Sequence, residues 1–163
     1  MKLDVGGKEV FAYTANHELD PAKRTVVFVH GAGLDHSWFG LQSRYFGYHG
    51  WNVLAVDLPG HGRSAGPPLA TVPAMADWLT AVLDAAKIQK ASLVGHSLGT
   101  LVALDCAARA VLCAAMEPPP PPEFSTTNDW SSARDSWSAT VRPMRSSPPP
   151  GCAGTRIFTA FAG

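Results

Sequence analysis

The sequence predicts an α/β fold, with a mostly parallel sheet and flanking helices, on three observations. Short apolar runs rich in β-branched residues recur along the chain without alternating with polar residues. Such runs are typical of strands covered on both faces of a parallel sheet. Longer segments with helical apolar spacing separate these runs, and the order strand, helix, strand favours right-handed crossovers. The pattern stops near residue 115, so we expect the sheet to be incomplete at its C-terminal side.

Four segments of the sequence are predicted to be strands or a hairpin. A Gly6-Gly7 turn followed by β-type residues over 9–14 predicts an early hairpin. Three apolar runs, at 25–30, 51–57 and 91–95, are predicted as the buried parallel strands. They are short and bounded by turn residues, as strands usually are.

The predicted helices lie between and after these strands. Residues 72–86 carry one apolar stripe, with Thr71 as the expected N-cap and Pro73 tolerated in the first turn. Residues 98–108 are apolar on nearly all faces, as in a helix packed deep beside a sheet. An earlier helix is predicted over 36–48, where the residues at roughly helical spacing are Trp38, Leu41, Tyr45, Phe46 and Tyr48.

The composition changes abruptly near residue 115. All 14 leucines lie at or before Leu112, whereas the last 47 residues hold nine of the 14 prolines and seven of the 12 serines. We therefore expect the N-terminal part of a domain over 1–115 and a Pro/Ser-rich tail over 116–163 that is disordered or out of frame. Residues 111–115 are expected to form one further strand before this tail.

Charge and composition exclude several function classes. The 13 basic and 13 acidic residues balance, which gives no support for a nucleic-acid or membrane-surface partner. No signal peptide is visible at the N-terminus and no apolar stretch reaches the length of about 18 residues that a membrane span needs. The three cysteines lack metal-type spacing and fit free thiols in a reducing compartment. We expect a cytoplasmic chain with no metal and no cofactor.

The residues 95–99, Gly-His-Ser-Leu-Gly, form a G-x-S-x-G sequence between a predicted strand and a predicted helix. In that context a serine is held on a sharp turn with its hydroxyl in a cleft, and the two glycines allow the strand and helix to approach closely. Ser97 is therefore the candidate nucleophile. The backbone N–H of Leu98, at a helix N-terminus, can face a developing oxyanion. The alternative is a chance turn in which the serine only caps a helix.

Two further motifs end the earlier strands. In the segment 30–33, His-Gly-Ala-Gly, Ala32 is the candidate for the second oxyanion donor, with Gly33 as the alternative, and His30 is expected to be structural. In the segment 57–64, Asp57 is expected to bind loop N–H groups and Arg63 to pair with a carboxylate. All three motifs lie at the carboxyl ends of strands, where open parallel sheets bind ligands.

These three motifs together resemble the N-terminal half of an α/β-hydrolase fold protein of the esterase, epoxide-hydrolase and C–C-hydrolase type. The resemblance covers about residues 1–110. It implies an α/β-hydrolase fold, with Ser97 as nucleophile and with Leu98 and Ala32 supplying the oxyanion hole. It also implies a small-molecule ester or related carbonyl substrate. The motifs do not indicate which substrate, and the oligomeric state stays open.

The base that would activate Ser97 is missing from the expected place. The family's triad runs Ser, then Asp or Glu, then His, and no histidine follows His96 in this chain. His36 and His61 are the upstream histidines nearest to strand ends, but both belong to loops with simpler structural roles. We therefore expect a serine hydrolase that is impaired or inactive in this chain. The alternatives are a non-catalytic, hydrolase-like binding protein and a non-functional truncated fragment.

Overall fold

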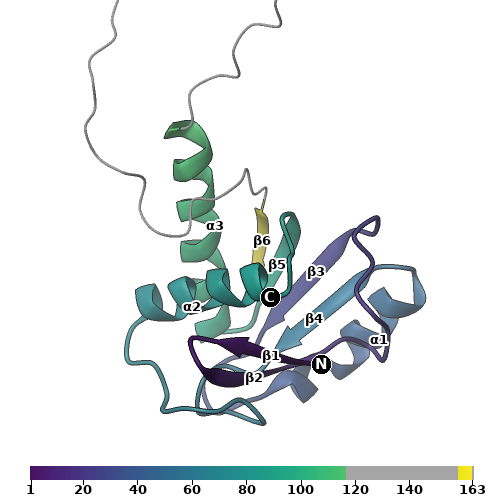
Figure 1. Cartoon of the computed structure of the whole chain (residues 1–163), viewed down its shortest axis with the longest axis horizontal. Helices are drawn as coiled ribbons and strands as arrows, with labels where there is room; N and C mark the ends of the chain where they lie inside the picture. The colour runs from purple at the N-terminus through teal and green to yellow at the C-terminus, as the bar shows by residue number, and fades with distance from the viewer. Residues whose placement is uncertain (117–157, 163) are drawn as a thin grey trace, which may run out of the picture.

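A computed structural model describes residues 1–116 and 158–162, with side chains described as far as residue 110. A six-stranded sheet forms the centre, in the order β1-β2-β4-β3-β5-β6 (Figure 1). β3 pairs in parallel with both β4 and β5, and β5 pairs in parallel with β6. β1 and β2 extend the sheet as an antiparallel hairpin. The prediction of a mostly parallel sheet with flanking helices is confirmed.

The N-terminal hairpin forms where the sequence predicts it. β1 (Lys2–Val5) and β2 (Lys8–Tyr13) pair with Val5 opposite Lys8, so Gly6 and Gly7 alone make the turn. Both glycines have positive φ, +61° and +75°, which is the conformation that a tight two-residue hairpin turn requires.

Two of the three central strands are buried on both faces, and the third is fully buried on one. β3 (Thr25–Val29) and β4 (Asn52–Val56) are buried at every residue, and β5 (Ala91–Gly95) at every second one. Successive side chains point to opposite faces, so β3 contributes to two cores. Val27 and Val29 belong to the larger core, whereas Val26 and Phe28 belong to the smaller one on the opposite face.

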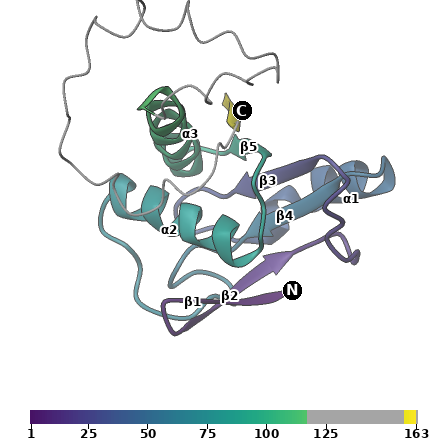
Figure 2. The ribbon, with the colours of Figure 1, turned by 45° about the horizontal axis from the view of Figure 1, so that its top comes forward.

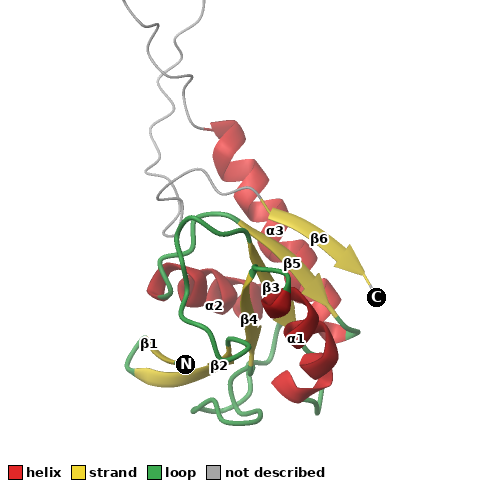
Figure 3. Ribbon diagram, turned by 90° about the vertical axis from the view of Figure 1, so that its right-hand side faces the viewer, coloured by secondary structure: helices red, strands yellow, loops and turns green. Residues whose placement is uncertain are grey.

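The helices form a layer on each side of this sheet. α2 (Val72–Ala85) and α3 (Leu98–Met116) pack against each other and supply the larger core. α1 (Gly40–Tyr48), preceded by the short 3₁₀ helix η1 (His36–Phe39), covers the smaller core. Figures 2 and 3 show the two layers from further directions, with α1 and α2 on opposite sides of the strands in Figure 3. Within the described residues, no helix has the length and apolar character needed to cross a membrane.

α2 matches its prediction closely. The Thr71 side chain accepts a hydrogen bond from the N–H of Ala74 at 3.3 Å, and Pro73 lies in the first turn. The apolar stripe faces the sheet, with Met75, Leu79, Val82 and Leu83 buried.

The helix predicted over 36–48 exists, but most of the large apolar residues that predicted it lie outside its buried face. Phe39 and Ser43 are buried there, and Gly47 packs against Ala15 so closely that an added Cβ would lie 2.7 Å from the Ala15 Cβ. Four of the residues at helical spacing are instead exposed: Trp38, Leu41, Tyr45 and Tyr48.

The end of the described chain differs from the prediction in two ways. Residues 111–115 continue α3 rather than forming a strand, because no Gly or Pro interrupts a run of good helix formers. The strand β6 (Phe158–Ala162), which lies in the segment expected to be a disordered or out-of-frame tail, pairs with β5. Residues 117–157 and residue 163, which belong to the same segment, lie outside the described residues.

Candidate active site

Ser97 occupies the turn between β5 and α3. It is one of four non-glycine residues with positive φ in the described chain, at +52°, a conformation that L-residues rarely adopt. The N–H groups of Gly99 and Thr100 donate to the carbonyls of His96 and Ser97 at 2.9 and 3.0 Å, so α3 begins immediately after the turn. The Ser97 side chain is exposed and forms no hydrogen bond to another described residue.

The glycines on either side of Ser97 make this sharp turn sterically feasible. A Cβ on Gly95 would overlap the backbone of Gly99 and Thr100, and a Cβ on Gly99 would overlap the carbonyls of Val29 and His30. α3 therefore starts in direct contact with the backbone of both β5 and β3. This close approach is the reason for which the sequence pattern requires glycine at the two positions.

The loop after β3 lies directly against the Ser97 turn. A Cβ built on Gly31 would lie 3.3 Å from the Ser97 Cβ and 3.2 Å from the His96 carbonyl oxygen. Ala32 follows and is exposed, and its N–H donates no hydrogen bond within the described residues. Leu98 is the first residue of α3, ahead of the N–H groups that bond within the helix. Ala32 thus lies in the loop that packs against the Ser97 turn, and Leu98 directly follows Ser97 at the start of α3.

His30 holds the base of this loop. It is fully buried, its Nδ1 lies 2.7 Å from the Gly31 carbonyl oxygen, and its Nε2 lies 3.0 Å from the Leu58 N–H. A neutral ring protonated at Nδ1 satisfies both contacts, since it donates to the carbonyl and accepts from the N–H. Burial lowers the pKa of His30 below its usual value, although the Gly31 carbonyl acts in the opposite direction. The structural role expected of His30 is confirmed.

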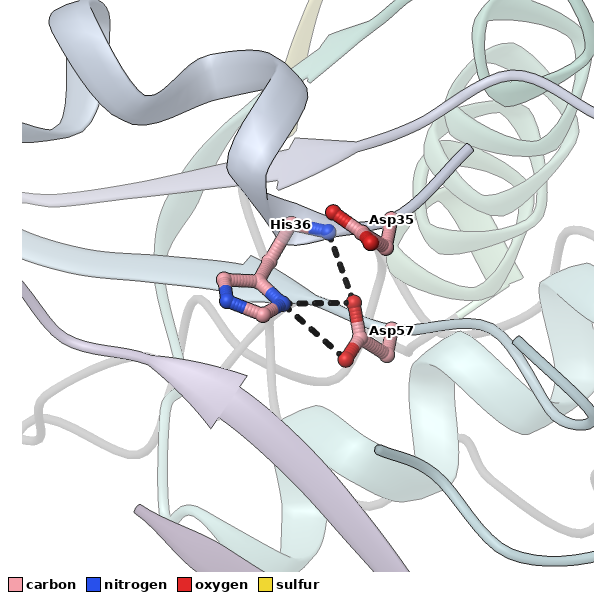
Figure 4. Close-up of side chains that lie close together, drawn as sticks. All are labelled: Asp35, His36 and Asp57. Atoms are coloured by element: carbon pink, nitrogen blue, oxygen red, sulfur yellow. Dashed lines mark hydrogen bonds and ion pairs between the residues drawn. The ribbon is translucent and has the colours of Figure 1, made fainter. Parts of the chain in front are cut away.

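Asp57 binds the loops after β3 and β4 together (Figure 4). Its buried carboxylate accepts hydrogen bonds from the His36 N–H at 2.6 Å, the His36 Nδ1 at 2.9 Å and the Arg63 N–H at 2.9 Å. The prediction that Asp57 binds loop N–H groups is therefore confirmed.

Among the described residues, Arg63 contacts an aromatic ring and not the carboxylate that the sequence predicts. No salt bridge of Arg63 occurs within the described part of the chain, and its guanidinium lies 4.8 Å from the centre of the Phe11 ring. Phe11 lies on β2, so this contact joins the loop after β4 to the hairpin instead.

Among the described side chains, one group brings three potential metal ligands together. Atoms of Asp35, His36 and Asp57 lie within 4.8 Å of one another. These atoms already have partners, because Asp57 accepts from the two loops and Asp35 accepts from the Ser37 N–H at 2.8 Å as the cap of η1. The group therefore has a structural role that needs no ion.

His36 and His61, the upstream histidines nearest to strand ends, both contact other residues. The His36 ring packs 4.8 Å from Phe11 of β2, while Ser97 follows β5 on the other side of β3. The His61 ring packs 5.3 Å from His30, and its Nδ1 lies 3.0 Å from the Pro59 carbonyl oxygen. Within the described residues, neither ring forms a hydrogen bond with Ser97.

Trp38 is a neighbour of the site that the sequence pattern does not single out. Its ring lies 4.6 Å from the ring of His96, the residue that directly precedes Ser97. The contact joins η1 to the turn after β5. The sequence alone does not predict this contact, because Trp38 looks there like one more apolar residue of a helix.

Comparison with known proteins gives a consistent result for fold and family. The family model described as "Alpha/beta hydrolase family" matches residues 26–162. Esterase YbfF of Escherichia coli K12 is 40% identical over 76 residues, which are 45% of this chain and 29% of that protein. 2-Succinyl-6-hydroxy-2,4-cyclohexadiene-1-carboxylate synthase of Salmonella typhimurium is 37% identical over 92 residues, 56% of this chain and 35% of that protein. The chain thus spans only about a third of the length of these relatives.

Solved structures show the same partial match. The enol-lactonase from Burkholderia xenovorans LB400 has a TM-score of 0.60 and 26% identity, over 67% of this chain and 42% of the other. A thermophilic esterase from Thermogutta terrifontis has a TM-score of 0.54 and 27% identity, over 66% of this chain and 40% of the other.

Proposed function

Because the chain belongs to the alpha/beta hydrolase family, we propose that it carries the nucleophile half of a serine hydrolase acting on an ester or a related carbonyl substrate. In this proposal Ser97 attacks the carbonyl, the C–O bond to the alcohol part of the ester breaks and the alcohol leaves, and water then hydrolyses the resulting acyl-enzyme to the free acid. The observation that carries the proposal is the positive φ of Ser97, +52°, at the turn between β5 and α3. The printed names of an esterase and an enol-lactonase among the similar proteins support the same reaction class.

The oxyanion of the tetrahedral intermediate is assigned to the N–H groups of Leu98 and Ala32. Leu98 begins α3, so its N–H lies at the positive end of the helix dipole. Ala32 follows Gly31, whose backbone lies against Ser97, and its N–H has no partner within the described residues. Both donors are backbone groups, one at the start of α3 and one in the loop after β3, and backbone donors held in place stabilise developing charge effectively.

In this proposal, none of the described residues acts as the general base that accepts the proton of the Ser97 hydroxyl. A hydroxyl is a poor nucleophile until a base accepts its proton, and no histidine follows His96 in the sequence. We therefore propose that these 163 residues are strongly impaired in hydrolysis on their own and keep only a slow rate that depends on Ser97. Oxyanion stabilisation alone leaves a small residual rate in enzymes that have lost the rest of the triad.

A non-catalytic binding protein is the second candidate function, and a non-functional truncated fragment is the third. The Ser97 turn and the adjoining loop would still bind a carbonyl compound without turning it over. Support for the third candidate comes from the change in composition near residue 115, where the leucines end and a Pro/Ser-rich segment begins. We also propose a cytoplasmic location, for which the buried free thiol of Cys106 is the support.

Hydrolysis of p-nitrophenyl acetate by the purified chain and by Ser97→Ala separates these functions. Under the proposal, the chain shows a slow rate that Ser97→Ala removes, and a fluorophosphonate probe labels Ser97 slowly. Equal background rates and equal absence of labelling in both proteins would eliminate the hydrolase and leave the binding protein or the fragment. Gel filtration and circular dichroism then distinguish these two, since a fragment that folds poorly aggregates through its open sheet edge.

A further inference from the structure

Trp38 places an exposed aromatic side chain beside the Ser97 turn. The residue is 51% exposed, and its ring lies 4.6 Å from that of His96. Ser97 directly follows His96 and is itself exposed. About half of the Trp38 surface is therefore open to solvent next to the proposed nucleophile.

The position of Trp38 is fixed by the structure around it. Its N–H donates to the Asp35 carbonyl at 3.2 Å, and the Asp35 side chain caps η1 through the Ser37 N–H. The next residue, Phe39, is buried and stacks on Phe28 of β3 at a ring distance of 4.8 Å. The turn that carries Trp38 is thus anchored to the central sheet, which fixes the point from which the indole extends.

A second large apolar side chain close to Trp38 in the sequence is also exposed. Leu41 lies one helical turn after Trp38 and is 74% exposed. Leaving large apolar side chains in water costs free energy, and sites for small molecules are lined mainly by aromatic and aliphatic side chains with few polar groups. Beside a serine that attacks a carbonyl, an apolar surface suits the hydrocarbon part of the substrate.

We propose that Trp38 forms the wall on which the apolar acyl chain of an ester substrate binds, and that it makes the chain prefer medium-length acyl groups to acetyl. This inference rests on the proposed function and specifies its substrate class. Each methylene of the acyl chain that contacts the indole leaves water, which favours longer acyl chains over acetate.

The test compares kcat/KM for p-nitrophenyl hexanoate and p-nitrophenyl acetate. In Trp38→Ala the hexanoate-to-acetate ratio is expected to fall about tenfold, mainly through KM, whereas Trp38→Phe retains most of it. Tyr48→Ala is the matched control, because Tyr48 is an 87% exposed aromatic residue at the far end of α1. Trp38→Gln, which keeps a long side chain over His96, serves if Trp38→Ala does not fold. An unchanged ratio in a folded Trp38 variant overturns the proposal.

A binding measurement separates this inference from the proposed function. If the chain has no Ser97-dependent turnover, the proposed function fails, but Trp38 is still testable with 4-nitrophenyl hexyl ether, which cannot be hydrolysed as an ester. In Ser97→Ala, saturation-transfer NMR is expected to detect this ether, and adding Trp38→Ala raises its Kd about tenfold. An equal Kd with and without Trp38, or no binding at all, overturns the inference.

Discussion

The buried carboxylate of Asp57 accepts hydrogen bonds from both the backbone N–H and the ring Nδ1 of His36, at 2.6 and 2.9 Å. One side chain at the end of β4 thereby fixes the start of η1, which follows the loop after β3. The same carboxylate also holds the Arg63 N–H at 2.9 Å. The three loops that surround the site are therefore not independent, since two of them depend on one buried acid.

Replacing Asp57 by Asn is expected to lower the free energy of unfolding by about 3 kcal/mol, because the amide cannot accept all of the hydrogen bonds and its NH₂ group faces other donors. Urea unfolding followed by circular dichroism measures this change. Asp35→Asn is the matched control, since Asn caps a helix as well as Asp and the change is expected to stay within about 0.5 kcal/mol. Similar stabilities for the two variants would contradict the role of Asp57.

His30 is expected to make stability depend on pH. Burial lowers the pKa of His30 in the folded chain below the ordinary value of 6.5. As the pH falls below 6.5, the unfolded chain therefore takes up a proton first, and stability decreases until the folded pKa is reached. Above 6.5 this contribution is fully present.

The measurement is the free energy of unfolding at pH 7.5 and pH 5.0 for the natural chain, His30→Asn and His17→Gln. The pH-dependent loss is expected to be smaller in His30→Asn, which lacks the titrating ring. His17 is exposed, so His17→Gln should behave as the natural chain does. The same pH dependence in all three proteins would show that His30 is not responsible.

Gly99→Ala is expected to destabilise the chain by at least about 3 kcal/mol, because the added methyl group overlaps the carbonyls of Val29 and His30 in a region with no room to relax. Gly40→Ala is the control, since Gly40 has a helical φ of −59° and nothing lies within 4 Å of an added Cβ. This control should be neutral or stabilising by up to about 1 kcal/mol. Thermal unfolding that ranks the variants in the reverse order would refute the close approach of α3 to β3.

Thr71→Ala is expected to cost about 1 kcal/mol by removing the hydrogen bond to the Ala74 N–H at the start of α2. Thr71→Ser keeps the hydroxyl and should restore most of the loss. Urea unfolding of the two variants checks this, and an equal loss in both would show that the methyl group matters rather than the cap.

Most of the described fold follows from local signals in the sequence. The Gly6-Gly7 turn, the Thr71 cap and the apolar stripe of α2 each depend on residues close together in the chain. The Ser97 turn was predictable for the same reason, since glycines two residues away on each side allow one specific backbone approach.

The features that were missed depend on contacts between distant residues. β6 pairs with β5 across more than 60 residues, and a short run in a Pro/Ser-rich segment carries no local sign of such a partner. The side chain of Arg63 lies over Phe11, although a carboxylate was the expected partner. On α1, spacing correctly predicted a helix, but small residues such as Ser43 and Gly47 take its sheet side, which a search for large apolar residues overlooks.

The pairing of β5 with β3 has a consequence for how the site can be lost. Val29 lies opposite Gly95, and the Val29 carbonyl accepts the His96 N–H at 3.1 Å, so the last hydrogen bond of the ladder ends one residue before Ser97. A slip of β5 by a single residue would move the serine by about 3.3 Å and turn every β5 side chain to the opposite face of the sheet. The placement of the nucleophile is therefore a property of strand alignment, and substitutions deep inside β3 or β5 could abolish it without touching any residue of the site.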